Sequence, residues 1–223
     1  PSVQEAFARL DEGTLEVFGE TPDRSVTLRT TPALQSQWLG PRLARFHLAH
    51  PEVTVRVVSA VWSSDFGAEG ADIELRYGQG EWRGMESISL GASSLLPVCT
   101  PPLAEQLVSL DALAGQTLLH AAGFAAGWPA WLEHAGRKDL SSHCHSLICD
   151  NLSMVMALAR QGAGVALVHR CLLEDPQGLV GPFDIEVPTR EGFWLCRPRS
   201  AQGSIESERL WRWLAGEVAP GPS

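Results

Sequence analysis

The feature that most constrains the fold is a short alternating run of apolar residues placed directly before a helical pattern. Val26 and Leu28 alternate with polar residues, and the helical pattern that follows ends near Ala49, where Pro51 prevents its continuation. A second apolar run occupies residues 53–58. A strand, a helix and a strand in this order predict a parallel α/β unit.

The second half of the chain repeats this order. An apolar run at 94–99 precedes a Trp-rich helical pattern at 128–136, and a strand pattern at 145–149 leads into a helical pattern at 152–161. Another strand pattern follows at 165–169. We therefore predict a second α/β unit of similar size.

The connections between the two units are predicted from extended segments. A strand at 72–77 completes the first unit, and the tail contains an extended segment at 193–198 and a helix at 204–215. We expect two Rossmann-like lobes joined by two extended crossings, at 94–99 and 193–198.

Composition narrows the class of protein. Hydrophobic residues make up 44% of the 223 residues and charged residues 19%, and no apolar run approaches the roughly 20 residues of a membrane span. The formal charge is −9 and the basic residues are scattered, so we expect this chain alone not to bind DNA. Five cysteines without a CxxC pair favour a cytoplasmic location. The start at Pro1, without a signal-peptide pattern, indicates a fragment.

The junction Thr30-Thr31-Pro32 is the first candidate binding segment. Pro32 suits the first helical position, which makes Thr31 the expected N-cap, and Leu34 cannot complete a capping box. Free backbone N–H groups at such a helix start attract anions, and ligands of open α/β sheets bind beyond the carboxyl ends of the strands. Plain helix capping is the alternative interpretation.

The second unit has a matching junction. Asp150 and Asn151 are candidate caps, and Ser153 lies in the first turn of the helix that follows. Two such helix starts facing each other would suit a small anionic or zwitterionic ligand. Here too, ordinary capping explains the same residues.

Several segments carry a family resemblance. In order and spacing, "WLGPRLARFHLAHPEVTVRV", "ADIELRYGQGEWRGMESISL", "LLPVCTPPL", "WPAWLEHAG", "LICDNLSMVMALARQGAGVALV" and "GLVGPF" resemble the effector-binding domain of LysR-type transcriptional regulators. The subgroup is similar to the glycine-cleavage and β-lactamase regulators, and the resemblance covers about residues 24–216. It implies a periplasmic-binding-protein-like fold of type II, in which two lobes enclose a small effector.

The resemblance also implies a domain organisation. Residues 1–23 would be the end of a linker helix with its connection, with the helical head itself at 3–18, and the DNA-binding winged helix-turn-helix would be absent from this chain. Residues 24–96 and 194–218 would form lobe I, and residues 97–193 would form lobe II.

Effector contacts are implied by position in the family. The expected residues are Thr30, Thr31, Pro32, Arg76, Tyr77, Gly78, Ser94, Asn151, Ser153 and His169. The sequence departs from the family pattern at Glu74, where an apolar residue is usual, and at His169 and Cys171. Arg76 has a second interpretation, as a structural ion-pair partner of Asp72 or Glu74.

The implied function is sensing of a carboxylate-bearing effector, with DNA bound only through the missing domain. Subunits would pair through the helix at 32–49 of one and the helix at 152–161 of the other, and we expect a tetramer for the full-length protein. The sequence contains no P-loop, GxSxG, HExxH or CxxC motif, so we expect neither an enzyme nor a cofactor or metal.

Two alternative functions remain open from sequence. One is a transport-type solute-binding protein with the same fold. The other is a thiol or metal sensor in "SSHCHSLIC", where a strand would place His143, His145 and Cys149 on one face and Cys144 on the other.

Overall fold

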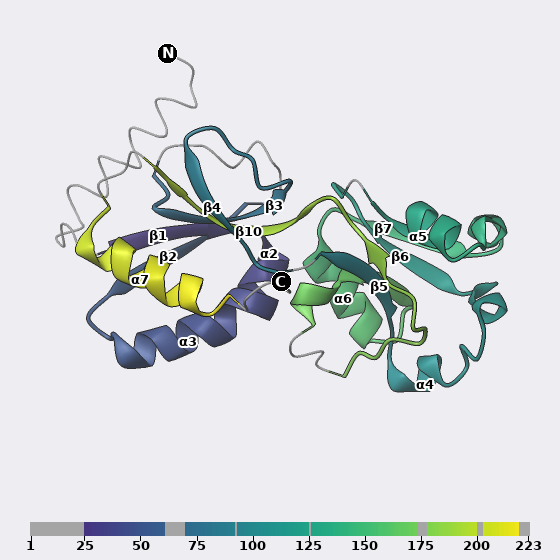
Figure 1. Ribbon diagram of the computed structural model, residues 1–223. Helices are drawn as coiled ribbons and strands as arrows, with labels where there is room; N and C mark the ends of the chain where they lie inside the picture. The colour runs from purple at the N-terminus through teal and green to yellow at the C-terminus, as the bar shows by residue number, and fades with distance from the viewer. Residues whose placement is uncertain are drawn as a thin grey trace, which may run out of the picture.

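The computed structural model describes residues 25–60, 70–91, 93–124, 126–173, 178–199 and 203–218. The helix expected at 3–18 lies outside these residues. The described residues form two lobes, each built on one five-stranded sheet (Figure 1). Among the described helices, none combines the length and the apolarity that a membrane span requires.

The sheet of lobe I is mixed rather than wholly parallel. Its strand order is β2-β1-β3-β10-β4. β1 runs parallel to β2 and β3, but β10 runs antiparallel to β3 and β4, because the chain returns from the other lobe to add it. The strands are β1 (Ser25–Thr30), β2 (Thr54–Ser59), β3 (Ile73–Gly78), β4 (Met85–Ser89) and β10 (Gly192–Pro198).

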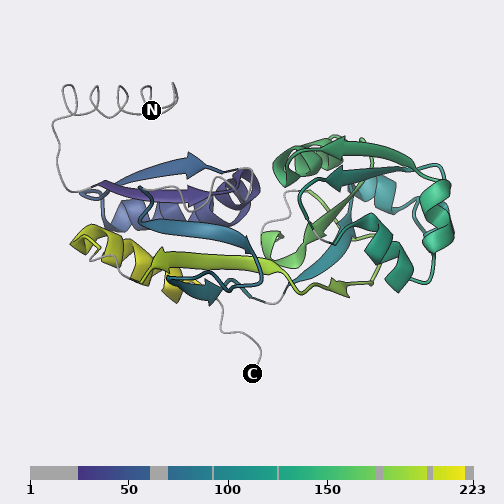
Figure 2. The same ribbon diagram turned by 90° about the horizontal axis from the view of Figure 1, so that it is seen from above.

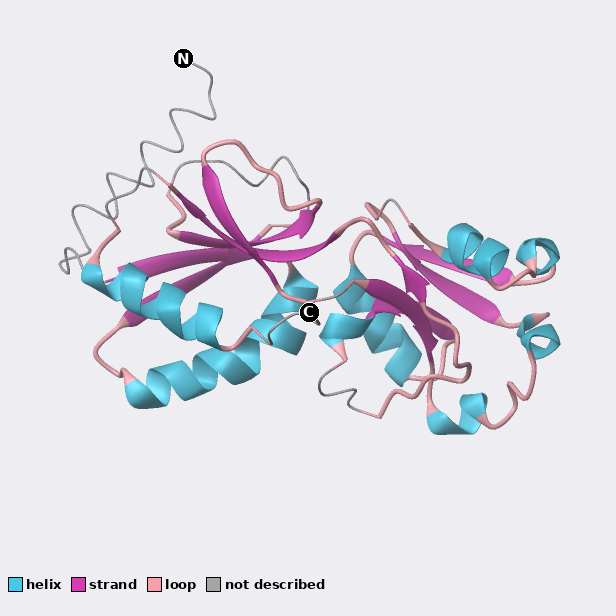
Figure 3. Cartoon of the chain, viewed as in Figure 1, coloured by secondary structure: helices cyan, strands magenta, loops and turns pink. Residues whose placement is uncertain are grey.

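The helix predicted at 32–49 is present but changes its winding. It consists of α2 (Pro32–Leu34), a π-helical segment η1 (Gln35–Leu39) and α3 (Gly40–Ala49). Within η1 the N–H of Gly40 donates to the carbonyl of Gln35, and this wider turn precedes Pro41, which lacks an N–H for a regular helical bond. Figure 3 shows α3 beside α7 (Ile205–Gly216) along one face of the sheet.

One side of this helix is buried against the sheet. Leu39 and Phe46 are 1% and 0% exposed, and Leu43 packs partly buried against the same core. The opposite flank of α3 carries Leu48, which is 82% exposed. The helix thus has a core face and a separate outer face.

Lobe II has the order β7-β6-β8-β5-β9 and a helix on each face. Alternate residues of one strand face opposite sides: Leu96 and Val98 pack in the core under α6, whereas Leu95 packs in a second core under α5. The elements are β5 (Ser94–Val98), α4 (Pro101–Ala104), η3 (Leu110–Leu113), β6 (Thr117–Ala121), α5 (Trp128–His134), η4 (Lys138–Ser142), β7 (His145–Cys149), α6 (Leu152–Arg160), β8 (Val165–His169), η5 (Arg170–Leu172) and β9 (Val187–Pro188).

The tryptophans of α5 belong to the core of lobe II. Trp128 and Trp131 are at most 1% exposed, and their indole N–H groups donate to the backbone carbonyls of Leu119 and Ile185 at 3.0 and 3.2 Å. Their rings pack edge to face. They therefore fasten α5 to the sheet.

The crossings between the lobes are shorter than the sequence suggested. β5 already belongs to the lobe II sheet and β10 to the lobe I sheet, so residues 90–93 and 189–191 make the two connections. The lobe boundaries expected at 96/97 and 193/194 would cut through β5 and β10. The apolar runs expected as crossings are therefore sheet strands, and most of their residues are buried. The crossings bond to each other through the N–H of Thr189 and the carbonyl of Ser93, at 2.9 Å. Figure 2 shows both connections between the lobes.

Candidate functional site

A cavity of about 220 Å³ lies between the lobes, at the carboxyl ends of β1, β3, β6 and β7. The helix start after β1 and the start of α6 both line it, and Figure 1 shows α2 and α6 close together at the lobe junction. The lining residues are Thr31, Pro32, Ala33, Arg76, Tyr77, Trp82, Ala122, Gly123, Phe124, Asp150, Asn151, Leu152 and Phe193.

Half of the ten expected effector residues line this cavity. These five are Thr31, Pro32, Arg76, Tyr77 and Asn151. The other five expected residues, Thr30, Gly78, Ser94, Ser153 and His169, are not among its lining residues.

The start of the lobe I helix is open toward the cavity. Thr31 has the extended backbone of an N-cap, as predicted, but its hydroxyl makes no capping hydrogen bond. The first backbone donor that a helical bond uses is the N–H of Gln35, which donates to the carbonyl of Thr31 at 3.0 Å. The N–H groups of Ala33 and Leu34 lie in the first turn, where no helical carbonyl can reach them. Such a turn can receive an anionic group.

The start of α6 is capped by its own side chain. Asn151 accepts a hydrogen bond from the N–H of Met154 at 2.9 Å, which confirms it as the N-cap. Its amide also donates to the carboxylate of Asp150 at 2.7 Å. The lobe II wall therefore combines a capped helix start with an exposed carboxylate.

Arg76 lies at the cavity and in an ion pair at the same time. Its Nε donates to the carboxylate of Glu74, which also accepts from Arg29 Nη1 at 3.1 Å. Asp72 instead accepts from the N–H of Thr27 at 2.8 Å, so Glu74 is the ion-pair partner. The guanidinium carbon of Arg76 lies 5.4 Å from the ring centroid of Trp82. Glu74 stands where an apolar residue is usual, and it is buried in lobe I. Arg29 and Arg76 compensate its charge, so a carboxylate is tolerated at this buried position.

An aromatic cluster from both lobes forms part of the cavity wall. The ring of Tyr77 lies 4.7 Å from that of Phe124 and 5.2 Å from that of Phe193, measured between centroids. Burial raises the pKa of Tyr77, and the nearby carboxylate of Glu191 raises it further. The Tyr77 hydroxyl is buried and has no hydrogen-bond partner among the described residues.

The other expected residues lie outside the cavity lining, with Ser153 in the first turn of α6. Thr30 is fully buried within β1, and Gly78 accepts a hydrogen bond from the indole of Trp194 at 3.0 Å. A side chain at Gly78 would meet the ring of Trp82 at 3.0 Å. Ser94 donates to Glu186 at 2.6 Å, and this bond is the main cause of the lowered pKa of that carboxyl. His169 packs against the aromatic cluster.

Three aromatic lining residues were not expected from sequence. Trp82 follows β3, Phe124 lies in the loop after β6, and Phe193 comes from β10. Each reaches the cavity through the tertiary arrangement. Only Trp82, in "GQGEWRG", lies directly after a strand end that the sequence predicted.

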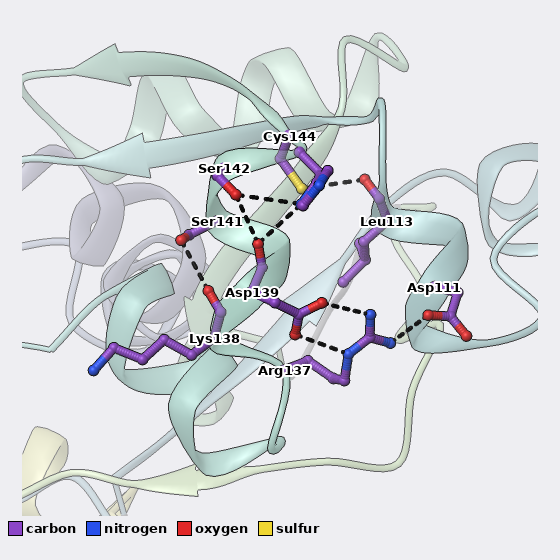
Figure 4. A network of polar contacts seen from close by, with 9 residues as sticks. Asp111, Leu113, Arg137, Lys138, Asp139, Ser141, Ser142 and Cys144 are labelled. Carbon is purple, nitrogen blue, oxygen red and sulfur yellow. Dashed lines mark hydrogen bonds and ion pairs between the residues drawn. The ribbon is translucent and has the colours of Figure 1, made fainter.

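The alternative sensor segment has a different geometry from the one proposed. His143 and Cys144 precede β7, so they do not alternate on a strand with His145 and Cys149. Cys144 donates to the carbonyl of Leu113 at 3.2 Å, in the polar network shown in Figure 4, and burial raises the pKa of its thiol. Burial and the carboxylate of Asp150 also raise the pKa of Cys149. Raised pKa values lower the thiolate fraction on which thiol reactivity depends.

The same network organises η4 at the outer end of lobe II. Arg137 bridges the carboxylates of Asp111 and Asp139, with contacts of 2.5 and 2.9 Å (Figure 4). His143 contacts the carbonyl of Asp139 at 3.0 Å. Within the described ranges, no group of three or more His, Cys, Asp or Glu side chains is arranged to hold a metal ion.

Comparisons with known proteins agree with this architecture. Residues 19–219 match the family described as the LysR substrate binding domain. The chain is 30% identical over 217 residues to the glycine cleavage system transcriptional activator of Escherichia coli K12, covering 94% of this chain and 70% of that protein. It is 33% identical over 219 residues to the transcriptional activator AmpR of Pseudomonas aeruginosa, covering 96% and 73%.

Solved structures show the same fold. The effector domain of AmpR from Pseudomonas aeruginosa superimposes with a TM-score of 0.72 at 30% identity, covering 88% of this chain and 95% of that domain. The AmpR effector-binding domain of Citrobacter freundii gives a TM-score of 0.74 at 23% identity, with coverages of 87% and 98%.

Proposed function

Because this chain belongs to the LysR substrate-binding domain family, where it is the ligand-sensing part of a transcriptional regulator, we propose that the cavity between its lobes binds a small carboxylate-bearing effector. The observation that carries this proposal is that two helix starts, one from each lobe, line a single cavity. A ligand there contacts both lobes, so its binding energy depends on their relative position.

The chemistry of the walls supports a carboxylate at the lobe I side. The Thr31 hydroxyl and the first-turn N–H groups are donors, and each favourable helix end contributes about 0.3–2 kcal/mol to a bound anion. Micromolar affinity needs roughly 8 kcal/mol, so further contacts must contribute. The rings of Tyr77, Phe124 and Phe193 offer apolar surface for the body of the ligand.

The position of Asp150 supports a limit on ligand charge. Its exposed carboxylate at the lobe II wall disfavours a second anionic group and favours a hydrogen-bond donor or an ammonium group there. A monocarboxylate or an amino acid fits this arrangement better than a dicarboxylate.

Control of DNA binding is proposed through the oligomer of the full-length protein. We infer side-by-side pairing of two chains, with the helix at 32–49 of one against the helix at 152–161 of the other, and a tetramer for the full-length protein. Exposed apolar side chains support this surface: Leu48 on α3 is 82% exposed and Met154 on α6 is 49% exposed. The edge strands β2 and β7 add Val57 and Ile148, and Figure 2 shows these strands along the same side of the two lobes.

The relatives also guide the proposals on activity and location. They are transcriptional regulators, so we propose a regulatory rather than a catalytic role, in the cytoplasm, with DNA contacted only by an N-terminal domain outside this chain. This proposal replaces the transport-type alternative.

A thermal-unfolding screen tests the effector class. Small monocarboxylates and amino acids are compared with their methyl esters or amides, which keep the body of the molecule but remove the charge. A true effector at a hundred times its dissociation constant adds about 2.7 kcal/mol to the unfolding free energy. The carboxylate proposal requires the neutral analogue to lose most of this gain, and equal stabilisation by acid and ester would contradict it.

A further inference from the structure

A second cavity, of about 30 Å³, lies in lobe II directly behind the effector site. Phe124 and Leu152 line both cavities, so the two adjoin. Its remaining lining is largely apolar, with two exceptions. Leucine and alanine side chains make up most of this lining.

The two exceptions are histidines whose Nε2 atoms lack partners. His120 lies in β6 and His169 ends β8, and the Nε2 atom of each is buried without a hydrogen bond to any described residue. His169 is only 1% exposed. Buried polar atoms in native proteins are almost always hydrogen-bonded, because the loss of hydration is otherwise not compensated. Two unpartnered nitrogens lining one small cavity therefore indicate a polar occupant.

The ring of His169 is held in a fixed orientation. Its Nδ1 contacts the hydroxyl of Ser93 at 3.1 Å, and its ring packs 5.1–5.3 Å from those of Tyr77, Phe124 and Phe193. Burial lowers its pKa to about 4 and also lowers the pKa of His120. Both imidazoles are therefore neutral near pH 7, and neither offers a charge to pair with an ion.

We propose that this small cavity, which we call the histidine subsite, is the deep end of the effector site and holds an uncharged hydroxyl group of the effector between Nε2 of His120 and Nε2 of His169. The proposal rests on the proposed function, since the body of the effector must occupy the cavity between the lobes. The volume matches one water-sized group. A hydroxyl both donates and accepts, so it satisfies one protonated and one unprotonated nitrogen at once.

The subsite is connected to the crossings between the lobes. Ser93, which contacts His169, lies in one crossing, and its hydroxyl accepts from Thr189 of the other crossing at 2.7 Å. A hydroxyl bound at Nε2 selects the ring nitrogen of His169 that carries the proton, and so selects the direction of the hydrogen bond to Ser93. Occupancy of the subsite thus acts on a hydrogen bond made by a crossing between the lobes.

Paired benzoates provide the test. 4-Hydroxybenzoate and 4-methylbenzoate have nearly the same shape and differ in the hydroxyl, and both carry the carboxylate expected at Thr31. Isothermal titration of the 223-residue chain should give an affinity for the hydroxyl compound about tenfold or more above that for the methyl compound. In His169→Phe, which keeps a ring in the aromatic cluster, and in His120→Leu, the ratio should fall to within about threefold.

Controls separate this proposal from the proposed function. His134→Leu changes an exposed histidine at the end of α5, outside the subsite, and should keep the full ratio. Equal affinity of the two benzoates for the wild-type chain, an unchanged ratio in both subsite variants, or failure of the hydroxyl compound to bind would overturn the subsite. The screen of carboxylates against their neutral analogues judges the effector site independently of these outcomes.

Discussion

Acidification should destabilise this domain mainly through His169 in the range between pH 6.5 and about 4. The imidazole is buried among aromatic rings, and its folded-state pKa is about 4 against an ordinary value of 6.5. Between these values the unfolded chain binds a proton that the folded chain does not. The unfolding free energy therefore rises with pH in this window and falls on acidification.

The magnitude follows from the two pKa values. At pH 7 the imidazole is largely neutral in both states, so its contribution is close to zero. At pH 5 the unfolded state is favoured by about 2 kcal/mol, because its imidazole is almost fully protonated whereas that of the folded state is not. The lowered pKa of His120 has the same sign and adds to the loss.

Urea unfolding of the wild-type chain and of His169→Phe, each at pH 7 and pH 5, measures this effect. Carboxylates titrate equally in both proteins, so the difference between the two losses isolates His169. We expect the wild type to lose about 2 kcal/mol more than the variant between the two pH values. Equal losses in the two proteins would show that His169 is not held neutral by its surroundings.

Three further predictions concern the site and its surroundings. Thr31→Val should change the unfolding free energy by less than about 0.5 kcal/mol, because the hydroxyl makes no capping bond. Asn151→Ala removes a capping bond and should cost about 0.5–2 kcal/mol. Equal losses of the two variants in thermal unfolding would contradict this difference. Both Gly78 and Gly84 have a positive φ, but a methyl group at Gly78 would also press against the Trp82 indole, whereas the space at Gly84 is open. Gly78→Ala should therefore lower the unfolding free energy, measured in urea, more than Gly84→Ala does. Met154→Asp, in the proposed pairing surface, should lower the dimer fraction in light scattering without changing the Tm of the monomer, and an unchanged dimer would place the interface elsewhere.

The sequence predicted the parts of the site that depend on local rules. Thr31 and Asn151 occupy the junction between a strand and a helix, where capping preferences and the direction of a parallel strand determine the position of the side chain. The same kind of rule predicted the helix that ends before Pro51. These features follow from short stretches and do not need the rest of the fold.

The remaining parts depend on contacts between distant segments. Phe193 reaches the cavity only because β10 returns to lobe I as an antiparallel strand, and Phe124 follows β6, a five-residue strand with no alternating pattern that the sequence reading did not predict. Ser94 was expected in the site, but it is bonded to Glu186 within lobe II. Side chains placed by loop closure and by strand pairing cannot be assigned from their neighbours in sequence alone.

The proposed effector site is tested most directly by a crystal structure of this chain with a monocarboxylate selected by the thermal-unfolding screen. We expect the ligand in the cavity between the lobes, with its body against Tyr77 and Phe193. Its carboxylate should lie within hydrogen-bonding distance of the Thr31 hydroxyl or of the N–H groups of Ala33 and Leu34. A stabilising carboxylate that is bound outside this cavity, or bound in it with its carboxylate turned away from the start of the lobe I helix, would contradict the proposed effector site.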